Sequence, residues 1–237
     1  MTEVQVGTAV IAYIEPHEGQ AQAFNRWYER DHFYAAATAG PGAFSGARWV
    51  ATRACKAVRP AGGTWFGDPA RGSYLTTVWL LEDTQDEWDA WVARQMETLR
   101  LQPRRMFDGR DHLHTAVYGF RGEHRSVRDG MATATALDHP FAGVIAIAAD
   151  AYASGGLSVM HEIAGPEIPV AALFVPERTI LSQSEPPPFD FVLGFTAGDP
   201  IAAWEARVAP ALPRLSVGFA SPFLRTIPGT DAYTDDL

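Results

Sequence analysis

The order of predicted strands and helices constrains this 237-residue chain more than any other feature, because that order occurs twice. In the first half, helices are predicted over 20–37 and over 84–102, the second with the hydrophobic spacing of an amphipathic helix. Strands are predicted from apolar, β-rich runs at 7–14, 47–58, 74–82 and 114–122. The first half is therefore predicted to fold in the order β-α-β-β-α-β, which is the ferredoxin-like arrangement.

The second half repeats this order in a weaker form. Asp199 is expected to cap its second helix, with Pro200 as the first helical residue. The polar, small residues 123–138 are predicted to be a linker between a unit at 1–122 and a unit at 139–237. Strands are predicted at 143–150, 170–181, 189–198 and 219–229. The fold class is therefore α+β, with two tandem ferredoxin-like units.

A tandem duplication is the simplest account of the repeated order. The tripeptide Ala-Gly-Pro occurs at 39–41 and again at 164–166. From the first glycine of the first strand to this tripeptide, the chain runs from position 7 to 39 in the first half, but only from 143 to 164 in the second. The difference is 32 minus 21, or 11 residues, which is about three helical turns. The second unit is therefore predicted to have a shortened first helix.

Charge and cysteine content restrict the partners and the compartment. The net charge of −9 disfavours nucleic acids and anionic membranes as partners, because an acidic surface repels both. The sole cysteine, Cys55, excludes an internal disulfide and fits a reducing compartment. No signal peptide or apolar run of membrane-spanning length is recognised, so a cytoplasmic protein is expected. Six of the seven tryptophans lie in the first, nearly neutral half, where an aromatic or uncharged ligand is expected to bind.

The first helix carries an unusual density of aromatic and titratable side chains. On an α-helix, Phe24, Tyr28 and His32 form one row and Trp27 and Asp31 the row beside it. His32 is the leading candidate for a general acid or base, because imidazole titrates near neutral pH. Tyr28 or Asp31 would orient the ring or polarise a substrate oxygen. The alternative is a surface histidine that caps the last carbonyl groups of the helix.

The same helix resembles that of a known superfamily. The matching residues are Phe24, Asn25, Trp27, Tyr28 and His32, followed by Pro41, Gly42 and Phe44. This pattern is similar to the first helix of the dimeric α/β-barrel superfamily, and especially to its EthD-like branch. The resemblance implies that the two units form one internal barrel. Members include cofactor-free monooxygenases, cyclases, isomerases, dehydratases and haem enzymes. Phe33 and Tyr34 stand where the family commonly has Leu/Ile-Pro, so this helix can continue past His32.

Further candidates come from other segments of the first half. His112 and His114 are expected to share one side of a strand, where either would supply a second proton-transfer group. No third ligand follows by spacing, so no metal is assigned. The glycine-rich loop 59–72 is either a lid or a loop anchored in the core by its aromatic residues. The candidate substrate-binding residues are Phe24, Trp27, Tyr34, Trp49, Trp65 and Phe66.

These features predict a cofactor-independent enzyme that acts on a hydrophobic small molecule, aromatic or polyketide-like, by His-mediated proton transfer. The reaction would be a dehydration, cyclisation or isomerisation. A cofactor-free monooxygenase and a non-catalytic binding protein are the alternatives. Haem is not expected, because no histidine lies in the second unit's helix after Asp199. A homodimer is possible if the shortened helix leaves the second sheet bare.

Overall fold

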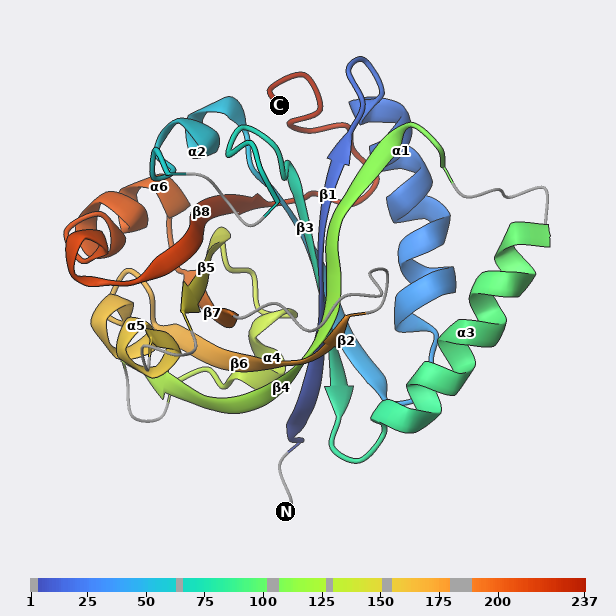
Figure 1. Ribbon diagram of the computed structural model, residues 1–237, viewed down its shortest axis with the longest axis horizontal. Coiled ribbons are helices and arrows are strands. Elements are labelled where there is room, and N and C mark those ends of the chain that lie inside the picture. The colour runs from blue at the N-terminus through green and yellow to red at the C-terminus, as the bar shows by residue number, and fades with distance from the viewer. Residues whose placement is uncertain (1–3, 63–65, 102–106, 127–129, 151–154, 180–188) are drawn as a thin grey trace.

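The computed structural model describes residues 4–62, 66–101, 107–126, 130–150, 155–179 and 189–237. Within them, one antiparallel barrel closes through strands in the order β1-β3-β2-β8-β5-β7-β6-β4 (Figure 1). The strands are β1 (Val6–Pro16), β2 (Ala43–Val50), β3 (Tyr74–Leu81), β4 (Arg110–Arg125), β5 (Gly143–Asp150), β6 (Val170–Thr179), β7 (Phe189–Thr196) and β8 (Val217–Arg225).

Helical segments connect these strands. The first unit contains α1 (Ala21–Trp27), the π-helical segments η1 (Tyr28–His32) and η2 (Tyr34–Thr38), α2 (Arg53–Ala57) and α3 (Gln85–Leu101). The remaining segments are α4 (Thr133–Ala136), α5 (Gly155–Ile163), α6 (Pro200–Ala203), η4 (Trp204–Val208) and η5 (Leu212–Arg214).

Each half of the barrel has the strand order of a ferredoxin-like unit. The first unit reads β4-β1-β3-β2, and the second reads β6-β7-β5-β8. The two sheets join at β4 and β6, and again at β2 and β8, where Trp49 pairs with Arg225 and Val50 with Leu224. The predicted fold of two ferredoxin-like units in one barrel is confirmed.

The barrel interior is a packed core. Strand alternation turns Ala9, Ile11 and Tyr13 inward and Val10 and Ile14 outward. Large aromatic side chains fill the inside, namely Trp49, Trp79, Tyr118, Phe174, Phe191, Phe195, Phe219 and Phe223. A ligand site is therefore expected between a sheet and the helices that cover it, and not inside the barrel.

Helices cover the outer faces on two opposite flanks. The segment from α1 to η2 and helix α3 lie on one side of the barrel, and α5 and α6 lie on the other (Figure 1). In the second unit, Ile145 and Ile147 of β5 are buried in one cluster with Val159 of α5 and Trp204 of η4. The hypothesis that a shortened helix leaves this sheet bare is therefore wrong. Helix α5 has 9 residues, and it covers the sheet together with α6 and η4.

Two predicted boundaries are wrong for local reasons. The strand predicted over 47–58 ends at Val50, because Thr52 caps a new helix by accepting a hydrogen bond from the Cys55 amide. Burial raises the pKa of the Cys55 thiol, which disfavours a reactive thiolate. The segment predicted as a linker, 123–138, begins inside β4, whose pairing with β6 continues to Arg125.

Candidate functional site

The first helix changes its winding at the residues that the sequence singled out. After Trp27 the backbone is π-helical, with the Phe33 amide bonded to the Tyr28 carbonyl five residues earlier. Residues five apart therefore approach one another, so Trp27 and His32 stack with ring centroids 4.3 Å apart. The predicted contact between Tyr28 and His32, four residues apart, is nevertheless present. Such π segments occur frequently at functional sites, but η4 in the second unit has the same winding.

His32 is buried within an aromatic group. One face lies against Trp27, and the ring of Tyr28 lies edge-on with a centroid 5.3 Å away. The alternative of an exposed capping histidine is therefore wrong, since only 9% of His32 is exposed. Burial, followed by the charges of Arg110 and His112, lowers the pKa of His32 to about 3. The imidazole is consequently neutral at neutral pH.

Tyr28 connects His32 to a second buried group. The guanidinium carbon of Arg48 lies 4.6 Å from the ring centroid of Tyr28 and 5.2 Å from that of Tyr74. Burial raises the pKa of the Tyr28 hydroxyl. A hydrogen bond with Thr76 and the charges of Arg48 and Arg110 act in the opposite direction and lower it. Arg48 belongs to β2 and points outward, towards η1, because its neighbours Ala47 and Trp49 point into the barrel. A cation thus occupies the layer between sheet and helix.

The polar contacts of Arg48 leave part of its guanidinium unpaired. Its Nη1 donates to Oδ1 of Asn25 at 3.0 Å and lies 4.0 Å from Oε2 of Glu29. Its Nε and Nη2 groups have no hydrogen-bond partner among the described residues. Burial lowers the pKa of Arg48. Because buried cations are normally fully hydrogen-bonded, this guanidinium is an exception that calls for an explanation.

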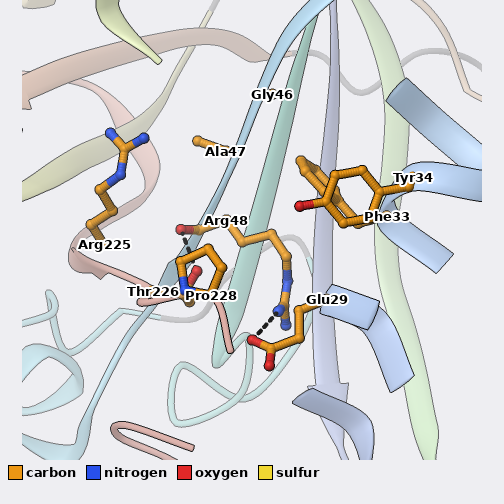
Figure 2. Close-up of a pocket in the computed structure, with 9 residues that line it drawn as sticks. All are labelled: Glu29, Phe33, Tyr34, Gly46, Ala47, Arg48, Arg225, Thr226 and Pro228. Carbon is orange, nitrogen blue, oxygen red and sulfur yellow. Dashed lines mark hydrogen bonds and ion pairs between the residues drawn. The ribbon is translucent and has the colours of Figure 1, made fainter. Parts of the chain in front are cut away.

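A cavity of about 110 Å³ lies beside Arg48. Figure 2 shows Arg48 and Glu29 on one side, with the aromatic side chains of Phe33 and Tyr34 above them. The chain after β8 contributes the opposite wall. The lining residues are Glu29, Phe33, Tyr34, Gly46, Ala47, Arg48, Arg225, Thr226 and Pro228. The candidate site therefore combines the first helix and β2 of the first unit with the end of the second unit.

The segment 226–231, here called the strap, crosses from the second unit to the first helix. The Gly229 amide donates to Oε1 of Glu29 at 3.2 Å. Asn25 donates from Nδ2 to the carbonyl oxygen of Thr230 at 2.9 Å. At the surface, Arg26 donates from Nε to Oδ1 of Asp231 at 3.0 Å. The strap thus closes the cavity through a few contacts, of which the exposed ion pair contributes little.

His112 and His114 lie on opposite sides of β4. Tyr13 pairs with His114, whereas the next residue, Ile14, pairs with His112, so Leu113 is an extra residue in β4. This bulge turns His114 into the barrel and leaves His112 outside, where Arg110 donates to it from Nε at 3.1 Å. The expectation that both rings share one side is wrong.

The remaining candidates lie apart from the cavity. His114 bonds to the Tyr118 hydroxyl at 2.7 Å inside the barrel. Trp49 is fully buried there and donates to Oγ1 of Thr77 at 3.1 Å. Phe66 packs on Phe219 with centroids 5.3 Å apart, as expected for a loop anchored in the core. Trp65 lies outside the described residues.

Inspection of the sequence missed Asn25, Glu29 and Arg48 as a group. Asn25 appeared only within the helix motif, and Arg48 received no assignment. Two local patterns in the sequence point to this group. Asn25 and Glu29 are four residues apart on a helix and therefore share a face, and Arg48 alternates with the inward-facing residues of β2. The contribution of the strap gave no signal, since it lies about 200 residues along the chain from Glu29.

The buried His114 provides a test of the barrel core. Burial lowers its pKa from 6.5 to about 4 in the folded state. Between those values the unfolded chain binds more protons, so the free energy of unfolding falls as pH decreases from 6.5 to 4. Because 2.5 pH units correspond to about 3 kcal/mol, His114→Gln is expected to flatten this dependence by about that amount. Urea unfolding at a series of pH values measures it, and an unchanged slope would contradict the assignment.

The cavity beside Arg48 does not fit a haem. It is lined by no histidine and is smaller than the roughly 150 Å³ that holds one benzene ring. The buried rings of His32 and His114 are enclosed by aromatic side chains. Within the described ranges, His, Cys, Asp and Glu form no group of three that could hold a metal ion. No helix of the described chain is long and apolar enough to cross a membrane.

Comparison with known proteins agrees with the observed architecture. No protein-family model matches the sequence, and no curated protein matches it. Among solved structures, an anthrone oxidase-like protein is similar with a TM-score of 0.57 and 8% identity, covering 96% of this chain and 95% of that chain. A haem-bound variant of DypB from Rhodococcus jostii RHA1 has a TM-score of 0.51 and 10% identity, covering 97% and 95%. At such identities the likeness concerns the fold alone, and the chain has the fold of the dimeric α/β-barrel proteins, with both units supplied by a single polypeptide.

Proposed function

We propose that this protein is an enzyme that acts on a hydrophobic, aromatic or polyketide-like small molecule by proton transfer. The site lies on the helix-covered face of the first unit. One observation carries the proposal, namely the uneven distribution of buried ionisable side chains. Among the described residues, every buried histidine or charged side chain lies in the first unit, and the list is Glu29, His32, Arg48, Arg59 and His114.

The matching face of the second unit is a control within the same chain. Its helix-covered face buries Ile147, Val159, Leu173 and Trp204, and among the described residues it buries no histidine or charged side chain. An apolar layer therefore suffices to pack helices onto a sheet of this fold. Buried ionisable groups do not stabilise a fold better than apolar residues of similar volume. Glu29, His32 and Arg48 are buried on the helix-covered face of the first unit and have no described counterpart on that of the second. This difference supports a chemical role for them.

In the proposed reaction, His32 receives a proton from a carbon or hydroxyl group of the substrate, and the electron pair remains on the substrate as an enolate or phenolate. Burial and the charge of Arg110 disfavour the imidazolium that forms. The negative substrate oxygen must therefore lie close to the ring, so that its charge stabilises the imidazolium. His32 then returns the proton at another atom, which completes an isomerisation, or to a departing hydroxyl group, which completes a dehydration. Tyr28 lies against both His32 and Arg48 and would position the substrate oxygen.

Two finer assignments belong with this proposal. We propose a relationship to the EthD-like branch, which the helix motif supports, and an origin by tandem duplication, which the paired order of strands supports. A cofactor-free monooxygenase remains the second candidate. It is favoured by the fold similarity to an anthrone oxidase-like protein. In that case, the carbanion or phenolate formed at His32 would react with dioxygen instead of being reprotonated.

The test compares His32→Gln with wild type on a panel of phenols, naphthols and anthrone. Loss of about 100-fold or more in kcat/KM, with ligand affinity retained, is expected if His32 transfers the proton. His124→Gln serves as the control, because His124 is a histidine on β4 that lies away from the cavity and pairs with His161. Dioxygen consumption during turnover would favour the oxygenase. Binding without turnover, or full activity of the His32 variant, would contradict the proposal.

A further inference from the structure

We propose that the cavity under the strap is a carboxylate-binding subsite, with Arg48 as the residue that recognises the carboxylate. The inference rests on the proposed function, because it names the chemical class of ligand that the same face would take. Arg48 lines the cavity, and only 4% of its side chain is exposed. The ligand implied is an aromatic acid whose carboxylate enters the cavity.

The unpaired groups of Arg48 match this ligand. In a guanidinium, Nε–H and Nη2–H point in the same direction along one edge and bind both oxygens of a carboxylate at once. These are the two groups without a partner among the described residues, whereas Nη1 on the other edge is bonded to Asn25. The hydroxyl of Tyr74, beside the same guanidinium, is also buried without a described partner. The donors of a bidentate site are therefore present and unused.

The charges around the cavity leave room for one anion. Arg48 and Arg225 line it together with Glu29, so the lining carries one net positive charge. Arg225 is held in place by the carbonyl oxygens of His139 and Leu137, to which its Nη1 and Nη2 donate at 2.7 and 2.5 Å. A bound carboxylate would neutralise the lining, although Glu29 would repel it. Removal of the Glu29 charge is therefore expected to strengthen binding.

The size and the opening of the cavity define the rest of the ligand. At about 110 Å³ it is smaller than a roughly 150 Å³ cavity that holds benzene, so only the carboxylate end of the ligand fits inside it. Tyr34, which also lines the cavity, is 53% exposed and offers a ring for an aromatic body at the entrance. Nε and Nη2 are buried in this arrangement, so the proposal requires the strap, which bonds to Asn25 and Glu29 beside Arg48, to lift when the ligand binds. Its surface ion pair between Arg26 and Asp231 is the weakest restraint.

Calorimetry with 2-naphthoate and its neutral analogue 2-naphthamide tests the inference. Wild type is expected to bind the acid about tenfold or more tightly than the amide. Arg48→Lys is expected to remove this preference, because lysine lacks the fork of two parallel donors. Glu29→Gln is expected to increase acid affinity, and Tyr34→Ala to weaken both ligands equally.

Equal affinity of wild type for acid and amide, or an unchanged preference in Arg48→Lys, would overturn the carboxylate site. Circular dichroism of each variant confirms that it is folded before binding is measured. If Arg48→Lys does not fold, the double variant Arg48→Met/Glu29→Gln, which removes both buried charges, replaces it in the test. This variant is likewise expected to lose the preference for the acid. Naphthoate binding is expected to persist in His32→Gln. Selective acid binding without turnover of any substrate would leave this site standing and refute the proton-transfer enzyme, whereas turnover without acid preference would do the reverse.

Discussion

Arg48→Met is expected to lower the free energy of unfolding by about 3 kcal/mol, because it leaves the Glu29 carboxylate buried without its cation. The side chains of Arg48 and Glu29 are only 4% and 5% exposed, with Nη1 and Oε2 4.0 Å apart. Glu29→Gln alone is expected to destabilise as well. The double variant Arg48→Met/Glu29→Gln removes both charges and should recover most of the loss. Urea unfolding of all four proteins measures the coupling directly.

The four-protein cycle separates stability from function at this pair. A coupling of about 2 kcal/mol is expected for two buried partners, whereas additive effects within about 0.5 kcal/mol would show that they do not interact. If the double variant is as stable as wild type, the pair is not retained for stability. That result is expected of a binding site, where buried polar groups contact a ligand and do not stabilise the fold.

Arg59→Met is expected to lower the free energy of unfolding by about 3 kcal/mol or more, since hydrogen bonds to a charged group contribute about 1.5–3 kcal/mol each. Arg59 donates from Nη1 to the carbonyl oxygens of Pro69 and Arg71 at 2.5 and 2.6 Å. Its Nη2 donates to the Gly72 carbonyl at 3.0 Å, and its Nε donates to Oγ of Ser221 at 2.8 Å. Burial lowers the pKa of Arg59 to about 10. Chemical denaturation measures the loss.

Arg71→Ala is the matched control for this prediction. Arg71 belongs to the same loop, but its side chain is 36% exposed and pairs with Asp111 at the surface. Its loss is expected to cost less than about 1 kcal/mol. Equal effects of the two substitutions would show that Arg59 does not hold the loop. Because Ser221 belongs to β8, a large effect of Arg59 would also show that this loop helps to join the two units.

The asymmetry between the two halves connects these expectations. The first unit contains the buried charged groups, and the second presents an apolar helix-facing cluster. The second unit nonetheless contributes to the first through the strap, whose Thr226 and Pro228 line the cavity. A single polypeptide therefore allows one half to change its chemistry while the other maintains the barrel. The predicted functional division between the units stays a prediction until substrate and variants are measured.

The sequence alone determined the order of elements and most of their bounds, because these depend on local periodicity and turn residues. The strand predicted at 143–150 is found at those residues. Asp199 caps its helix by accepting a hydrogen bond from the Ile201 amide, with Pro200 in the first turn. The two-unit fold follows from this order, since β-α-β-β-α-β elements pack in few ways.

The site depended on features that no local pattern encodes. The π winding after Trp27 stacks His32 on Trp27, and the extra residue Leu113 turns His112 and His114 to opposite sides. The bulge moves a side chain by one position in the strand repeat, which is enough to exchange a buried face for an exposed one.

The partners of Arg48 were decided by the tertiary structure alone. Asn25 and Glu29 approach it from the first helix, and the strap arrives from the far end of the chain. Hydrogen bonds and ion pairs act over a few ångströms, so their partners are set by where the barrel closes and not by separation along the chain. The sequence predicted which half would carry the aromatic and titratable residues, and the closure of the barrel decided which of them meet at the cavity.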